Sequence, residues 1–339
     1  FGGDQEDLGQ YIDFHNNSFI IGGQTFSTNG IATEGAFQDS IASGKDGYIA
    51  KFDTNGAVIW GTYFGGSGWD YQQDVQADSE GNVYLCSETD SPELGFGPRK
   101  NTPFSLSQYD ILLAKISPDG KKRLWTTYFY GYGFEIPNTL YIDEEDFLFV
   151  IGQSDSDNLD MRGGFQKESG DGGDESDAII AKFDKNGKRL WASYYGGESE
   201  GDGYYYDNGY GIDKNSKDQI VICGHTGCAD VFGGGGFQPE YGGGVQDGWI
   251  ALLQDYPVSY PPPASDVCQG GVVKISFELK IPLPEDYEFI VHLSDSSENF
   301  DDPLVVGRLV TRSSGTITAR IPENIPSGKN YYISLADAP

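Results

Sequence analysis

The stretch DGYIAKFD, residues 46–53, decides the fold because it returns three more times, as DILLAKIS from Asp110, DAIIAKFD from Asp177 and DGWIALLQ from Asp247. The first three copies are each followed by a glycine-containing turn and an aromatic segment: IWGTYFGG with Trp60, LWTTYFYG with Trp125 and LWASYYGG with Trp191. A nearly constant period of this kind is typical of an array of like units that bury their faces on one another.

Two further segments complete each repeat, and all four segments have the pattern of β-strands. One is a short alternating strand at 10–13, 74–77, 139–142 and 210–213. The other is apolar: SFIIGGQT from Ser18, NVYLCSET from Asn82, FLFVIGQS from Phe147 and QIVICGHT from Gln219. Alternation between polar or glycine turns indicates antiparallel hairpins, and no stretch shows sustained helical periodicity. Four strands per repeat predict an all-β chain made of β-propeller blades.

These motifs resemble the bacterial β-propeller repeat family, often abbreviated SBBP. The resemblance covers residues 1–255 and includes a small G-x-F-Q-like element before the Asp strands, at 35–38, 164–166 and 236–238. The second repeat departs from it, with Thr102-Pro103-Phe104 at that element. The resemblance implies a propeller and implies no chemistry.

Within residues 1–255 we predict four blades, at 9–64, 72–130, 138–196 and 208–255, with each Trp segment outermost. The last blade lacks a Trp segment of its own, whereas Phe1-Gly2-Gly3 matches the end of one. Two interpretations stay open: the start supplies the closing strand of a small ring, or further blades precede it. We expect the edge of strand 247–254 to be covered by preceding residues, another chain or the C-terminal domain, because a bare edge invites aggregation.

After Asp255 the composition changes. Residues 256–263 are rich in proline and predict a stiff, extended linker. Residues 264–339 contain short strands such as VVKISFEL, LVVGRLV and GTITARIP, which suit a small immunoglobulin-like β-sandwich. The pattern around Cys268, Gly270, Gly307, Ile321 and Tyr331 resembles immunoglobulin-like modules of large surface proteins of Bacteroidetes-type bacteria.

The charge balance limits the kinds of partner that the chain can bind. With 52 acidic and 22 basic residues the net charge is −30, which excludes nucleic-acid binding as the main activity because phosphate recognition needs a basic face. The charge also disfavours anionic membrane surfaces, and no apolar run is long enough to span a bilayer. It suits a salty exterior, where screening weakens self-repulsion. We therefore expect a secreted bacterial protein at the cell surface.

The cysteines and histidines carry no recognisable catalytic or zinc motif. Cys86 and Cys223 occupy the same repeat position, so we predict that both are reduced and buried. Cys228 and Cys268 are left open, either as thiols or as a pair. No enzyme activity is expected.

Carboxylates suggest two calcium sites, since calcium prefers carboxylate oxygens. Four of them precede the first strand of each repeat: Asp7, Asp70, Glu135 and Asp207. The alternative is that each fixes its loop by accepting backbone amides, and we favour it. An acidic stretch at 171–177 is the second candidate, through Asp171, Asp174, Glu175 and Asp177.

Three tyrosines, Tyr204, Tyr205 and Tyr206, lie in a longer loop at 198–207 and are candidates for contact with a sugar or a partner protein. Packing across the blade is the alternative. Together these features predict a non-enzymatic, extracellular structural or adhesion module of a large multi-domain surface protein or multi-copy assembly. Its partners would be proteins, either further copies or neighbouring modules. A lectin-like propeller that binds polysaccharide through its loops is the alternative.

Overall fold

The computed structural model describes residues 1–94, 109–161, 163–170, 175–198, 206–215, 219–231, 238, 240–254, 258–259, 269–279, 288–293, 304–311, 313, 315–325 and 333–337. The chain divides into two compact units, Phe1–Leu253 and Gln254–Pro339. The described residues contain no α-helix and only one short 3-10 helix, η1 (Ala229–Val231), so the all-β prediction is confirmed.

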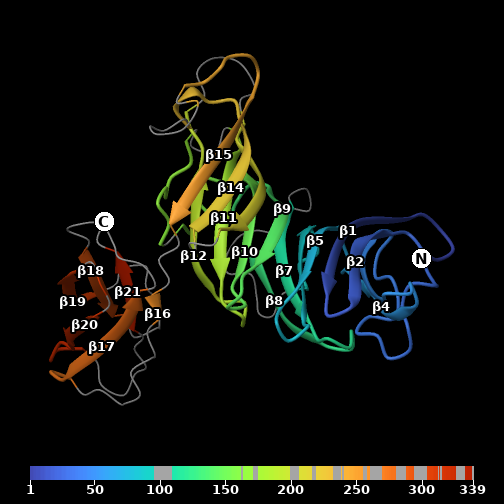
Figure 1. Ribbon diagram of the computed structural model, residues 1–339, viewed down its shortest axis with the longest axis horizontal. Helices are drawn as coiled ribbons and strands as arrows, with labels where there is room; N and C mark the ends of the chain where they lie inside the picture. The colour runs from blue at the N-terminus through green and yellow to red at the C-terminus, as the bar shows by residue number, and fades with distance from the viewer. Residues whose placement is uncertain are drawn as a thin grey trace. The chain divides into compact units, whose positions relative to one another are not determined.

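The N-terminal unit contains four separate antiparallel sheets, built in chain order (Figure 1). Sheet one has β1 (Asp7–His15), β2 (Ser18–Thr25), β3 (Asp46–Asp53) and β4 (Val58–Phe64). Sheet two has β5 (Asp70–Ala77), β6 (Val83–Thr89), β7 (Asp110–Ile116) and β8 (Arg123–Phe129). Sheet three has β9 (Glu135–Ile142), β10 (Leu148–Ser154), β11 (Asp177–Phe183) and β12 (Arg189–Tyr195). Sheet four has β13 (Asn208–Lys214), β14 (Gln219–Thr226) and β15 (Asp247–Gln254).

Each sheet is a simple meander in which neighbours in sequence pair with each other. The first strands β1, β5, β9 and β13 lie beside one another in succession, so we call them the inner strands. The tryptophan segments form β4, β8 and β12 at the opposite edge, so we call these the outer strands. The predicted strand order within the repeats is therefore confirmed, and sheet four has three strands among the described residues.

Successive sheets pack face to face. We call the face of a sheet that packs on the next sheet its following face, and the opposite face its preceding face. The junction of sheets one and two buries Ile20 and Ile49 against Val75 and Leu112. The other two junctions use the same repeat positions, with Tyr84, Leu113, Leu140 and Ile179 between sheets two and three, and Phe149, Ile180, Ile212 and Trp249 between sheets three and four. Because sheets two and three are covered on both faces, β7 and β11 are buried along their whole length.

The two end sheets each have one face that no other described sheet of the N-terminal unit covers. On the preceding face of sheet one, Ile12 is 67% exposed, and on the following face of sheet four, Ile250 is 75% exposed. No closed sheet forms among the described residues, and β15 is the last strand of its sheet there. The open edge that we expected to be covered therefore has no pairing strand in the described part of the chain.

The prediction for the cysteines is half wrong. Cys86 is fully buried, as expected, whereas Cys223 is exposed. Both side chains lie on the following face of their sheets, but the Cys86 face is covered by sheet three, whereas no described sheet of the N-terminal unit covers the following face of sheet four. Burial at this repeat position therefore depends on the neighbouring sheet and not on the residue. Cys228 is buried, and Cys268 lies outside the described residues.

The C-terminal unit has two three-stranded antiparallel sheets, ordered β16-β17-β20 and β19-β18-β21. Their strands are β16 (Val258–Ser259), β17 (Val272–Leu279), β18 (Glu288–Leu293), β19 (Leu304–Val310), β20 (Gly315–Arg320) and β21 (Ile333–Asp337). One core holds residues of both sheets, including Ile275, Val291 and Ile317. Within the predicted linker, Val258 and Ser259 pair with Leu279 and Glu278 at the end of β17, so this part of it belongs to a sheet.

Candidate functional site

The four predicted carboxylates stand where an inner strand begins, and they hold the connection between one sheet and the next. Asp70 is fully buried, and its oxygens accept hydrogen bonds from the Gly66 amide at 2.7 Å and from the hydroxyls of Thr89 and Ser91 at 2.5 and 2.9 Å. The same three kinds of donor surround Asp7 (Gly3, Thr25 and Ser27) and Glu135 (Gly131, Ser154 and Ser156). Asp207 accepts from the Gly197 amide at 2.8 Å.

Burial acts more strongly on these carboxyl groups than their hydrogen bonds do. It raises the pKa of Asp70 to about 6 and the pKa of Glu135 to about 7, against amide and hydroxyl hydrogen bonds that lower both values. Each group is therefore a structural acceptor in a dry environment. This geometry agrees with the loop-fixing alternative at these positions.

No group of three or more metal-binding side chains exists among the residues that the structure describes. In the acidic stretch at 171–177, residues 171–174 lie outside the described part, so Asp171 and Asp174 cannot be placed. Asp177 is buried and accepts the Gly170 amide at 2.7 Å, as Asp46 accepts the Ala42 amide at the same repeat position. Calcium binding at 171–177, including Glu175, stays a prediction.

A row of aromatic rings lies beside the buried carboxylates. The residues immediately before three of the four carboxylates are aromatic and exposed: Trp69 by 53%, Phe134 by 37% and Tyr206 by 37%. Trp69 packs edge-on against Tyr71 at 6.0 Å between ring centroids, and Tyr71 against Tyr109 at 5.9 Å. Tyr109 in turn lies 6.2 Å from Phe134 of the next sheet. We call Trp69, Tyr71, Tyr109 and Phe134 the aromatic row.

The backbone holds the two exposed ends of the aromatic row in place. Asp90 accepts the Trp69 amide at 2.5 Å and returns its own amide to the Trp69 carbonyl at 3.2 Å. Asp155 makes the same pair of hydrogen bonds with Phe134. A backbone held in this way needs less ordering when a ligand stacks on the rings that it carries.

The ammonium group of Lys45 and the carboxylate of Glu88 border the aromatic row. The ammonium group of Lys45 lies 4.0 Å from the centroid of the Tyr71 ring, within the range of a cation–π contact. Burial, with smaller contributions from Tyr109 and Glu88, raises the pKa of Tyr71 to about 12, so its hydroxyl stays protonated and can donate. The surface therefore combines flat apolar faces with hydrogen-bonding groups.

Of the three predicted tyrosines, Tyr204 and Tyr205 lie outside the described residues. Tyr206 lies edge-on to His225 at 5.1 Å between centroids, and Tyr210 packs on the same ring at 5.2 Å. The Nε2 atom of His225 is buried and has no hydrogen-bond partner among the described residues, and burial lowers the pKa of this imidazole. The tyrosine prediction thus points to a second, smaller aromatic cluster.

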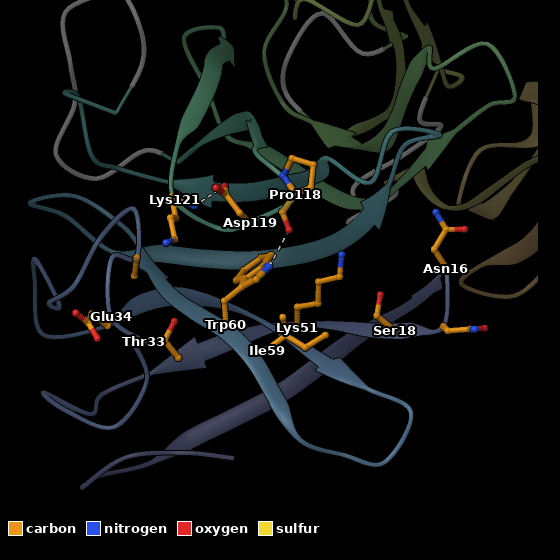
Figure 2. A pocket seen from close by; sticks show the side chains of 12 residues that line it. Asn16, Ser18, Thr33, Glu34, Lys51, Ile59, Trp60, Pro118, Asp119 and Lys121 are labelled. Atoms are coloured by element: carbon orange, nitrogen blue, oxygen red, sulfur yellow. Dashed lines mark hydrogen bonds between the residues drawn. The ribbon is translucent and has the colours of Figure 1, made fainter.

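A pocket of about 680 Å³ lies between the outer strand of sheet one and the turn that precedes β8 in sheet two. Figure 2 shows Trp60 reaching across it, with its indole nitrogen 2.9 Å from the carbonyl oxygen of Pro118. Lys51 and Lys121 border the pocket on either side. Trp60 is only 5% exposed, so it joins the two sheets and offers little surface to a ligand.

Two histidine rings are described, and their contacts are to a side-chain amide and to tyrosine rings. His15 contacts the side-chain amide of Asn16 at 2.7 Å, and His225 contacts tyrosine rings. Neither is bonded to a hydroxyl or a thiol in the described part of the chain. The aromatic row, in contrast, is an exposed set of neighbouring rings that can stack on a flat ligand.

No protein-family model matches the chain, and no curated protein is detectably similar to it.

Sequence reasoning missed Trp69, Phe134 and Tyr109. A signal was present, because Trp69 and Phe134 are the residues just before Asp70 and Glu135, which the repeat alignment had already matched. Tyr109 has no such signal, since it joins the aromatic row only through the packing of two different sheets.

Proposed function

We propose that residues 1–253 form four consecutive blades of a β-propeller and that the chain is a non-enzymatic, extracellular structural or adhesion module of a bacterial surface protein. The observation that carries this proposal is the repeated junction: three successive sheet pairs are built from the same positions of the repeat. Blades of a propeller follow one another in this way, with the first strand innermost.

The use of the polar groups supports a structural function. The carboxylates that begin the inner strands accept amide and hydroxyl groups of the connecting loops, so they serve the scaffold. The net charge of −30 keeps such a scaffold soluble in salt and away from nucleic acid. Under this proposal the C-terminal unit is an immunoglobulin-like module that follows the blades. Among the described residues no helix is long and apolar enough to cross a membrane.

The test combines a binding assay with an activity screen. Fluorescently labelled chain is titrated onto intact bacterial cells and onto purified cell-wall polysaccharide, and the same preparation is screened against ester, glycoside, phosphate and peptide substrates. We expect saturable binding and no turnover. Turnover that persists after repurification would contradict the proposal.

The aromatic row favours a second candidate, a lectin-like surface for polysaccharide. The aromatic row, which extends from sheet two to sheet three, offers the flat apolar faces on which sugar rings stack, and Lys45 and Glu88 lie beside it. A glycan array tests this candidate. If a glycan stacks on the aromatic row, we expect its binding to fall at least tenfold in Trp69→Ala. The equally exposed Phe165→Ala, on the loop beside β12, is the matched control and keeps its affinity. An unchanged signal in Trp69→Ala would remove the lectin candidate.

A further inference from the structure

The two uncovered end faces of the N-terminal unit are apolar. On the following face of sheet four, Ile250 is 75% exposed and Leu252 is 55% exposed, with Cys223 beside them on β14. On the preceding face of sheet one, Ile12 is 67% exposed and Phe14 is 57% exposed. Large apolar side chains gathered on one face of a sheet indicate a surface that binds another protein surface.

The repeat positions identify what these faces fit. Ile250 corresponds to Ile49, Leu113 and Ile180, which are all buried on the following faces of sheets one to three. Ile12 corresponds to Val75 and Leu140, which are buried on the preceding faces of sheets two and three. The following face of sheet four and the preceding face of sheet one are thus the two halves of the junction that the unit forms three times.

The contact between the halves can be located by residue. A side chain placed at Gly22, the position that corresponds to Cys223, would come within 2.8 Å of Val75, the position that corresponds to Ile12. Cys86 and Leu140 occupy these two positions at the next junction and share one core. In a junction of the same kind Cys223 would therefore lie on Ile12.

Hydrogen bonds between neighbouring inner strands form a polar part of two junctions. Asp13 of β1 accepts the Ala77 amide of β5 at 2.9 Å, and Gln76 of β5 accepts the Ile142 amide of β9 at 3.0 Å. The corresponding donor and acceptor at the open faces are the Phe14 amide of sheet one and the Asp213 carboxylate of sheet four. The apolar and polar parts of the junction are both present at the two ends.

Phe1 packs on the preceding face of sheet one as the corresponding aromatic residues pack on later sheets. Phe1 packs on Tyr48 at 5.7 Å and on Phe52 at 5.3 Å between ring centroids. At the repeat-equivalent places, Phe129 packs on Phe183 and Tyr195 packs on Trp249. Sheet one therefore presents a preceding face of the same construction as those of sheets three and four.

We propose that the following face of sheet four binds the preceding face of sheet one of a second copy of this chain, head to tail. The inference rests on the proposed structural function and names its partner. A second copy is the occupant because each copy carries both halves of the junction, on sheets one and four, and these two sheets do not pack on each other in the described part of the unit (Figure 1). A contact of this heterologous type either closes a ring or extends into a filament, and two copies closing on each other would give eight sheets.

The test uses two complementary variants, Ile12→Asp and Ile250→Asp, because each places a charge in one half only. Mass is measured by light scattering after size-exclusion chromatography at 0.3 M NaCl, which screens the net charge of −30. Wild type is expected to gain mass with concentration, and each variant alone is expected to stay at the 37.0 kDa of one chain. An equimolar mixture is expected to reach twice that mass, since each variant supplies the half that the other lacks.

Leu124→Asp is the matched control, because Leu124 is also exposed but lies on the outer strand of sheet two, which is covered on both faces. It is expected to associate as wild type does, and all variants should keep the wild-type circular dichroism because their sites are exposed. A monomeric wild type at every concentration, or a mixture that stays monomeric while wild type associates, would overturn the inference. Cell-surface binding by a monomer would still leave the proposed function standing.

Discussion

Trp60 of sheet one packs on Gly120 of sheet two. The indole ring lies on the glycine, and the indole nitrogen donates a hydrogen bond to the carbonyl of Pro118, two residues before Gly120. The next junction repeats the arrangement with Trp125 on Gly187 and a hydrogen bond of 3.0 Å to the Lys185 carbonyl. The outer strand of one sheet is thus fastened to the turn of the next. The corresponding turn of sheet one, at Gly56, carries no such contact.

This relationship predicts the effect of one substitution against a matched control. Gly120 has φ +70°, and a Cβ there would lie 2.5 Å from the Trp60 ring, so Gly120→Ala must displace the ring and strain the backbone. Gly56 has φ +81° with open space around it, so Gly56→Ala carries only the backbone strain, about 1 kcal/mol. We expect urea unfolding to show a loss for Gly120→Ala that is larger by roughly 1–3 kcal/mol. Equal losses would mean that the Trp60 contact adds nothing.

Thiol labelling should separate the two repeat-equivalent cysteines. Burial raises the pKa of the Cys86 thiol, and no reagent reaches it while the sheets stay packed, whereas Cys223 is exposed. In brief reaction with a bulky maleimide at low protein concentration, we expect mass mapping to find Cys223 modified at least a hundredfold faster. Comparable rates at the two cysteines would show that sheets two and three do not seal their junction.

Asp70 should contribute to the pH dependence of the free energy of unfolding. Its pKa rises from an ordinary 3.8 to about 6 in the fold, so the folded state holds the proton more tightly than the unfolded chain does. The stabilisation is therefore complete below pH 4 and is lost as the pH rises through about 6. Asp70→Asn removes this titration while keeping an amide oxygen for the Gly66 amide.

Urea unfolding of wild type and Asp70→Asn between pH 4 and 8 checks this directly. The free energy of unfolding of wild type, taken relative to the variant, should fall by about 1–3 kcal/mol over that range. Glu135→Gln should behave likewise, with the fall continuing to about pH 7 because the pKa of Glu135 is about 7. A difference that rises with pH would mean that these carboxylates are stabilised as anions.

Much of the fold follows from the sequence because the repeat fixes it. The strand patterns around Trp60, Trp125 and Trp191 predicted both the four-stranded sheets and the position of each tryptophan at the sheet edge. Each strand has a partner that is close in sequence, so local alternation and turn residues are sufficient to set the order and register.

What the sequence could not settle depends on contacts between repeats. Cys86 and Cys223 are equivalent by alignment, yet their exposure differs because only one of them is covered by a following sheet. The aromatic row is assembled in the same way, since Tyr71 and Phe134 come from different sheets and meet only through Tyr109. A repeat alignment gives the position of a side chain within its sheet and does not give its neighbour.

If Cys223 and Ile12 lie on the two halves of one junction, a disulfide cross-link should join these two positions between two copies of the chain. Ile12→Cys is expected to place a thiol within disulfide reach of the natural Cys223 of a second copy, by analogy with the close approach of Gly22 and Val75. After mild oxidation, non-reducing electrophoresis should show covalent multimers of Ile12→Cys that disappear when Cys223→Ser is added, and none for Leu124→Cys. Multimers that persist without Cys223, or none at concentrations where wild type associates, would contradict the head-to-tail junction.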